Sequence, residues 1–296
     1  MTSLHATPVG PGLPLPFADA PVEQLVTIWL DQLDVIRDLA EELTAEQWAA
    51  ASPCPGWSAG DVVAHILALE SELHGSPLPD HEPDWAALPH ITNATGKLTE
   101  RAVDWYRAKG QDVVVAELVE ITAWRHDDLA ESANTATDPN ELISGPLGLE
   151  LPRDRMIRIR IMDTWVHEQD IRTAVEISGG LRSDAAWVCA GQLLFGLPFV
   201  WGKKAAAPIG ATLDLTVTGP GVSFERLMRV SPNGRAEFVQ ALETAPTLTV
   251  TLDWPTYAAA SAGRLQSATS AALIANSCIG DKELAARLIP ALAITP

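Results

Sequence analysis

The stretch LPFVWGKKAAAPIGATLDLTVT, residues 197–218, separates two parts of the sequence that differ in character. Its first part contains prolines, glycine and two adjacent lysines, a composition typical of a linker. Its last part, residues 212–218, alternates apolar and polar residues with the period of two that a half-buried strand requires. We therefore expect the chain to change from one kind of fold to another across residues 198–210.

The residues before this stretch are patterned as helices. Between Val22 and Leu43, apolar side chains recur at spacings of three and four, which places them on one face of an amphipathic helix. Ser58 and Asp61 have the spacing of a capping box at the start of a second helix. Further helical patterns cover residues 97–129, with a possible break at Gly110, and residues 153–177 and 184–196.

The residues after this stretch are patterned mainly as strands. Alternating or β-rich segments lie at residues 224–230, 236–239 and 247–252, with helical patterns at 254–263 and 281–290. The sequence therefore predicts an α+β chain of two domains. A helical bundle covers residues 21–200, and a small α+β domain covers residues 211–296. Residues 1–20 are rich in proline and glycine and are expected to form a flexible arm.

Composition limits the possible partners and location of the chain. Its 38 acidic and 20 basic residues give a formal net charge of -18, which disfavours binding to nucleic acid or to an anionic membrane surface. Apolar runs stay below the roughly 18 residues that a membrane span needs. The cysteines Cys54, Cys189 and Cys278 are too far apart for a disulfide framework or a cysteine zinc site. We therefore expect a cytoplasmic protein, and the sequence does not indicate an oligomeric state.

A candidate metal site follows from the spacing of acidic and histidine residues. Asp163 and His167 lie four residues apart on one predicted helix and therefore share a face. His65 lies on the inward stripe of another predicted helix, and Asp170 could accept a hydrogen bond from a ligating imidazole. Two imidazoles and one carboxylate form the ligand set of a catalytic zinc with an open position. A surface ion pair would explain the same Asp-x-x-x-His spacing.

Two longer segments resemble a known family. CPGWSAGDVVAH, residues 54–65, and DTWVHEQDIR, residues 163–172, are similar to segments of the mycothiol-dependent maleylpyruvate isomerase family, within the wider DinB-like group. The resemblance continues in residues 248–257, 262–264 and 279–284, which are similar to a sterol-carrier-like C-terminal domain. It implies a DinB-like four-helix bundle followed by that domain. Because the chemistry of the family uses a thiol from the cofactor, the resemblance also indicates a packing role for Cys54, and Trp57 is expected to be a core residue.

The resemblance also implies a ligand set and a cofactor. It maps the metal ligands of the family onto His65, Asp163 and His167, although the isomerase has a glutamate where this chain has Asp163. It implies mycothiol as cofactor or co-substrate. It maps onto Arg264 an arginine that reaches from the C-terminal domain and holds a carboxylate, as a catalytic and cofactor-binding residue.

The function expected from this resemblance is that of a metalloenzyme, with zinc as the expected ion. A low-molecular-weight thiol would act on a small electrophilic substrate, as an isomerase if the thiol is released or as an S-transferase if it is retained. Two alternatives remain open. The same three ligands could activate water in a hydrolase, or the chain could be a non-catalytic protein that binds a small ligand.

Overall fold

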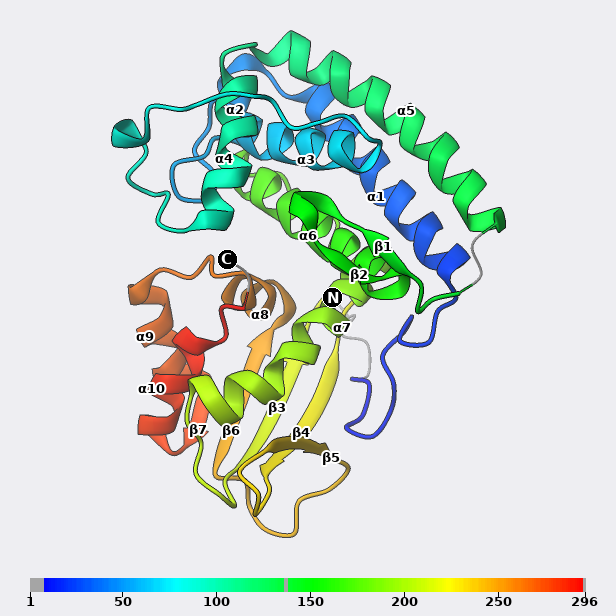
Figure 1. Cartoon of the computed structure of the whole chain (residues 1–296). Helices are drawn as coiled ribbons and strands as arrows, with labels where there is room; N and C mark the ends of the chain where they lie inside the picture. The colour runs from blue at the N-terminus through cyan, green and yellow to red at the C-terminus, as the bar shows by residue number, and fades with distance from the viewer. Residues whose placement is uncertain (1–7, 136–137, 295–296) are drawn as a thin grey trace, which may run out of the picture. The chain divides into compact units, whose positions relative to one another are not determined.

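The computed structural model of the chain describes residues 8–135 and 138–294, which form two compact units. The helical unit consists of residues 19–180, and the sheet unit consists of residues 1–18 together with residues 181–296. Helices dominate the first unit, whereas the second contains a five-stranded sheet (Figure 1). The predicted α+β class with two domains is therefore confirmed.

The helical unit is built on a bundle of four long helices, as predicted. Helix α1 (Val22–Glu42) packs against α5 (Gln111–Thr135) and α6 (Arg153–Ala174), and α3 (Ala59–Leu73) packs against the same two helices. The unit also contains α2 (Ala45–Trp48), η1 (Trp85–Ala87), α4 (Ala94–Arg107), β1 (Leu142–Ser144), η2 (Pro146–Gly148) and β2 (Glu150–Pro152). Strands β1 and β2 pair in an antiparallel hairpin.

Local sequence explains where these helices begin and end. The Ser58 hydroxyl accepts a hydrogen bond from the Asp61 amide at 3.1 Å, and the Asp61 carboxylate accepts one from the Ser58 amide at 2.8 Å. This reciprocal capping box starts α3 and confirms the prediction. Gly110 has a positive φ of 85° between α4 and α5, so the predicted break in the helical pattern occurs where glycine is favoured.

The sheet unit has the strand order β5-β4-β3-β6-β7. Its strands are β3 (Thr212–Thr218), β4 (Phe224–Val230), β5 (Ala236–Val239), β6 (Leu248–Asp253) and β7 (Cys278–Gly280). Strand β3 occupies the centre, pairing antiparallel with β4 and parallel with β6. Its side chains alternate in burial as predicted: Leu213, Leu215 and Val217 are buried, and the residues between them are half-buried.

Helices of the sheet unit pack against this sheet and against one another (Figure 1). They are α7 (Asp184–Phe199), the π-helical turn η3 (Val200–Lys204), α8 (Trp254–Ser261), α9 (Ser267–Asn276) and α10 (Lys282–Ala291). The boundary predicted near residue 200 is therefore wrong. Helix α7 belongs to the sheet unit, and residues 198–204 continue it rather than forming a linker, because Val200 and Trp201 are buried in that unit.

The predicted flexible arm also differs from the structure. Residues 1–7 lie outside the described part of the chain. Val9 pairs with β4: its amide donates to the Ser223 carbonyl, and its carbonyl accepts from the Glu225 amide, both at 2.9 Å. The Arg226 guanidinium donates to the carbonyls of Gly10 and Leu13 at 3.0 Å. Residues 9–13 are thus fastened to the sheet unit by backbone pairing that their composition does not reveal.

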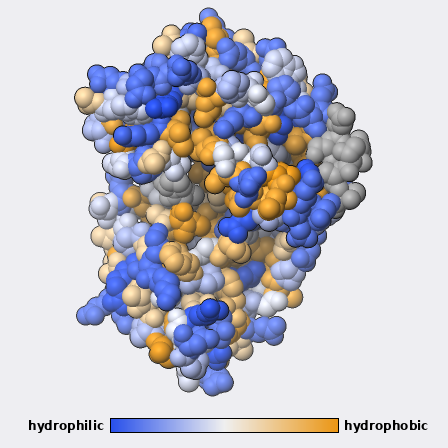
Figure 2. Space-filling model, in the orientation of Figure 1, coloured by the Kyte–Doolittle hydropathy of each residue, from blue (hydrophilic) through white to orange (hydrophobic). Residues whose placement is uncertain are grey.

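One helical stretch, Asp184–Lys204, is long and apolar enough to cross a membrane by length and composition alone. The sequence analysis expected no such run. Its most apolar window is 56% buried within the structure, as is typical of the core helix of a folded domain. On the face shown in Figure 2, hydrophilic side chains are interspersed with smaller apolar groups. We interpret α7 and η3 as core elements of the sheet unit.

Candidate metal centre

The structure brings His65, Asp163 and His167 together inside the helical unit. One ligand atom from each residue lies within 4.8 Å of the other two. The nearest Asp163 oxygens lie 3.9 Å from His65 Nε2 and 3.7 Å from His167 Nε2. Two ligands of a tetrahedral zinc at about 2.1 Å are about 3.4 Å apart, so small side-chain shifts would accommodate the ion. The donor set and its spacing therefore fit a zinc ion.

The packing of two bundle helices produces this convergence. His65 comes from α3, and Asp163 and His167 lie one turn apart on α6. The two imidazole rings meet edge to face with centroids 4.8 Å apart. Both histidines are buried, whereas 28% of the Asp163 side chain remains accessible. The three residues predicted from spacing are thus neighbours, and the carboxylate is the most accessible of them.

Asp170 fixes the orientation of the His167 ring. The His167 Nδ1 atom lies 3.0 Å from Asp170 Oδ2, and the same oxygen accepts a hydrogen bond from the Cys54 thiol at 3.1 Å. A carboxylate can only accept, so Nδ1 carries the proton and Nε2 faces Asp163 and His65. This is the arrangement by which carboxylates orient metal-binding histidines in proteins. The predicted hydrogen bond from a histidine ring to Asp170 is present, and Cys54 contacts the site in addition to its packing role.

Neighbouring charges shift the pKa values of Asp163 and His167 in opposite directions. Burial raises the pKa of Asp163, but the positive charges of Arg160, His167 and His65 outweigh it and lower that pKa to about 2. Burial lowers the pKa of His167, but the Asp163 charge and the hydrogen bond to Asp170 outweigh it and raise that pKa to about 10. In the absence of a cation, a protonated His167 therefore compensates the negative charges of Asp163 and Asp170.

Arg160 is a site residue that the sequence analysis did not identify. Its Nη1 donates to Asp163 Oδ2 at 2.7 Å, while Nη2 and Nε donate to Glu70 Oε1 at 2.7 and 3.2 Å. Glu70 Oε2 accepts from Arg125 Nε at 3.1 Å. Arg160 lies three residues before Asp163 and could have been suspected from that spacing. Its second partner, Glu70, lies 90 residues away and could not.

Trp57 forms a wall beside the two imidazoles. Its ring centroid lies 5.2 Å from that of His65 and 6.4 Å from that of His167. The indole Nε1 donates to Glu100, a fully buried carboxylate, at 2.7 Å. The segment that carries Trp57 turns at Gly56, whose φ is +80° and where a Cβ would meet the His90 ring at 2.4 Å. Trp57 thus contacts the site in addition to its expected packing role.

The other described histidines and Arg264 have partners of their own. Four other histidines lie next to carboxylates outside the ligand cluster: His74 beside Asp128, His81 beside Asp104, His90 beside Glu100, and His126 beside Asp34. Arg264 belongs to the sheet unit, just after α8, where it is half-buried and donates to the Ala262 carbonyl at 2.8 Å.

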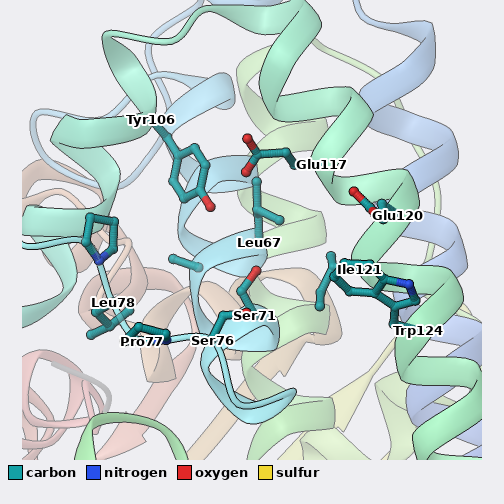
Figure 3. Close-up of a pocket in the computed structure, with 12 residues that line it drawn as sticks. Leu67, Ser71, Ser76, Pro77, Leu78, Tyr106, Glu117, Glu120, Ile121 and Trp124 are labelled. Carbon is teal, nitrogen blue, oxygen red and sulfur yellow. The ribbon is translucent and has the colours of Figure 1, made fainter.

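A cavity of about 290 Å³ lies between α3, α4 and α5 (Figure 3). The side chains of Tyr106 and Glu117 lie close to each other and line it, together with Leu67 from α3 and Trp124 from α5. Burial and the charge of Glu117 raise the pKa of Tyr106, so its hydroxyl stays protonated. The lining residues of this cavity do not include the three candidate ligands. It is therefore separate from the candidate metal centre.

Comparisons with known proteins identify a family for the helical unit. Residues 29–172 match the family model described as the mycothiol maleylpyruvate isomerase N-terminal domain. The helical unit belongs to this domain family. The matched residues include all three candidate ligands, together with Arg160 and Trp57. The family suspected from residues 54–65 and 163–172 is therefore confirmed. No curated protein sequence matches the chain.

Two solved structures share the fold of the whole chain. The crystal structure of the mycothiol-dependent maleylpyruvate isomerase aligns with a TM-score of 0.53 and 15% identity, covering 85% of this chain and 92% of that one. A histidine-to-alanine mutant of that isomerase aligns with a TM-score of 0.50 and 14% identity, covering 84% and 92%. The coverage extends beyond the helical unit, so the likeness includes the two-domain fold.

Proposed function

We propose that the chain is a zinc-dependent enzyme that uses mycothiol, or a similar low-molecular-weight thiol, on a small electrophilic substrate. One observation carries the proposal: His65, Asp163 and His167 converge in the interior of a domain that belongs to the mycothiol maleylpyruvate isomerase N-terminal family. The name of the aligned crystal structures supports the thiol and the isomerase activity. The reaction is an isomerisation if the thiol is released and an S-transfer if it is retained.

His65, Asp163 and His167 would hold the metal in this proposal. A bound zinc would favour the thiolate form of the thiol and so supply a nucleophile near neutral pH. Asp163 is already ionised, because its pKa is about 2. Asp170 holds His167 through Nδ1 and leaves Nε2 directed toward the other ligands. Trp57 covers the imidazole side, which limits the access of water to those two rings.

Arg264 would bind a carboxylate of the thiol or of the substrate. Support comes from the resemblance of residues 262–264 to the family and from the chemistry of guanidinium, which binds carboxylates with two parallel hydrogen bonds.

The proposed use of mycothiol as a free thiol requires a reducing compartment. Cys54, Cys189 and Cys278 are free and buried, and we propose a cytoplasmic location on that basis.

Metal analysis combined with a thiol titration tests the proposal. Protein purified without chelators should contain about one divalent metal per chain, and a His65→Ala/His167→Ala variant should lose it. The cobalt-substituted protein should develop a sulfur-to-metal absorption band when mycothiol is added. Stoichiometric metal in the double variant would refute the ligand set. Turnover without thiol, with a cobalt spectrum indifferent to mycothiol, would favour a hydrolase that uses the same ligands to activate water.

A further inference from the structure

Arg160 connects the candidate metal centre to a buried chain of charges. Only 2% of Arg160 is exposed, and its guanidinium donates to two carboxylates at once, Glu70 and Asp163. Glu70, 1% exposed, also accepts from Arg125, whose guanidinium carbon lies 5.0 Å from the centre of the Trp29 ring. The chain Arg125–Glu70–Arg160–Asp163 contains two positive and two negative charges, so it is neutral as a whole.

The geometry of this chain restricts the Asp163 carboxylate. A guanidinium is planar and rigid, and two of the Arg160 nitrogens are anchored on a single oxygen of Glu70. The direction of the third nitrogen, Nη1, is thereby fixed, and it donates to Asp163 Oδ2. The terminal torsion of an aspartate is otherwise broad. In this orientation Asp163 Oδ1 lies 3.7 Å from His167 Nε2, and Oδ2 lies 3.9 Å from His65 Nε2.

We propose that Arg160 is a positioning residue of the metal centre: by holding Asp163 Oδ2 it fixes the carboxylate in the orientation that faces the two imidazoles. This inference rests on the metal site proposed above and adds a role for a residue that does not contact the ion. Because Glu70 compensates Arg160, the guanidinium orients the carboxylate while the network adds no net positive charge that would repel the metal. Glu70 in turn holds Arg160, and Arg125 holds Glu70.

A double substitution tests the orientation of the Asp163 carboxylate without changing the net charge around the site. Arg160→Gln combined with Glu70→Gln removes one positive and one negative charge, so the net charge around the site is unchanged. The matched control is Arg172→Gln combined with Glu168→Gln. Arg172 Nε donates to the buried Glu168 carboxylate at 2.6 Å on the same helix, and neither residue belongs to the ligand cluster. Both double variants lose an arginine–glutamate pair whose glutamate is buried, but only the first loses the contact to Asp163.

Cobalt is the probe, because its absorption spectrum reports ligand geometry without any need for activity. For the Arg160→Gln/Glu70→Gln variant we expect cobalt affinity to fall about 10- to 100-fold, the usual cost of removing a group that orients a ligand. The visible absorption band should also change, because Asp163 becomes free to rotate. The control variant should retain the wild-type affinity and spectrum. Arg160→Lys, which keeps the charge but lacks the planar fork, should fall between the two.

The outcomes distinguish this inference from the proposed function. Wild-type affinity and spectrum in the Arg160→Gln/Glu70→Gln variant would overturn the positioning role while leaving the metal site intact. Failure of the wild-type protein to bind cobalt would overturn the metal site itself. Circular dichroism checks that each variant is folded. If the double variant is unfolded, Arg160→Lys decides, and an unaltered cobalt spectrum in that variant overturns the positioning role.

Discussion

Replacing Glu70 with leucine should destabilise the helical unit by about 3–4 kcal/mol, near the lower end of the range for breaking a buried ion pair. Leucine is similar in size but cannot accept the three hydrogen bonds that Glu70 receives from Arg160 and Arg125. Both guanidiniums are buried and would lose their main partner. The cost stays below its maximum because Arg160 keeps Asp163 at 2.7 Å and Arg125 keeps Asp128 at 3.5 Å.

Urea denaturation near neutral pH, followed by far-ultraviolet circular dichroism, measures this cost. The chain has two units, so the transition that carries most of the helical signal is the one to compare. A loss of about 3 kcal/mol should lower its midpoint by at least about 1 M urea, since slopes of roughly 1–3 kcal/mol per molar are usual. Metal-free protein should be used, because bound metal stabilises the folded state by mass action.

An exposed ion pair in the same unit supplies the control. Glu82 and Arg101 lie 2.9 Å apart, but their side chains are 64% and 44% exposed. Glu82→Leu should therefore cost less than about 1 kcal/mol, because water solvates both charges when the pair is broken. If Glu70→Leu costs no more than Glu82→Leu, the inference that burial makes the Glu70 network structurally important is refuted.

Three further predictions concern the metal centre and the thiol. In the metal-free protein His167 carries an extra proton, because its pKa is raised to about 10, and a metal must displace that proton. Zinc affinity, measured by chelator competition, should therefore rise with pH up to about 10. An affinity that does not change with pH would contradict this. Cys54→Ser should retain stoichiometric metal in elemental analysis, since the hydroxyl can still donate to Asp170; loss of metal would indicate that Cys54 is a ligand instead. Arg264→Ala should weaken mycothiol binding, measured by titrating the cobalt-substituted protein, without removing the metal. Arg264→Lys should restore mycothiol binding only partly. Unchanged mycothiol binding in Arg264→Ala would exclude the proposed contact.

Local patterns predicted much of the fold because they depend on residues close in sequence. The alternation in residues 212–218 corresponds to β3, the Ser58–Asp61 box begins α3, and Gly110 separates two helices. The boundary near residue 200 was wrong because Pro198 was interpreted as a break. In the structure Pro198 lies inside α7, and the helix continues because Trp201 is fully buried. Burial of a large side chain overrode local propensity there.

Local patterns also predicted part of the candidate site, whereas contacts between distant residues were missed. Asp163 and His167 could be paired from their spacing on one helix, His65 could be added from its place on the inward stripe of another, and the family resemblance selected the same three residues. The contacts of Glu70 and Trp57 could not be anticipated. Glu70 reaches Arg160 across 90 residues of sequence, and Trp57 lies beside the imidazoles because α3 packs on α6. Contacts between helices depend on packing, which a single sequence pattern does not specify.

The accessibility of the ligands indicates from which side a thiol or substrate would reach the metal. The His65 and His167 side chains are only 8% and 9% exposed, and Trp57 lies against both rings, whereas 28% of the Asp163 side chain is accessible. An incoming ligand would therefore approach past the carboxylate rather than past the imidazoles. A mobile carboxylate on that side would obstruct the open position of the ion. An aspartate held from the interior by Arg160 leaves that approach clear, which is a physical reason for placing a buried arginine next to a negatively charged metal ligand.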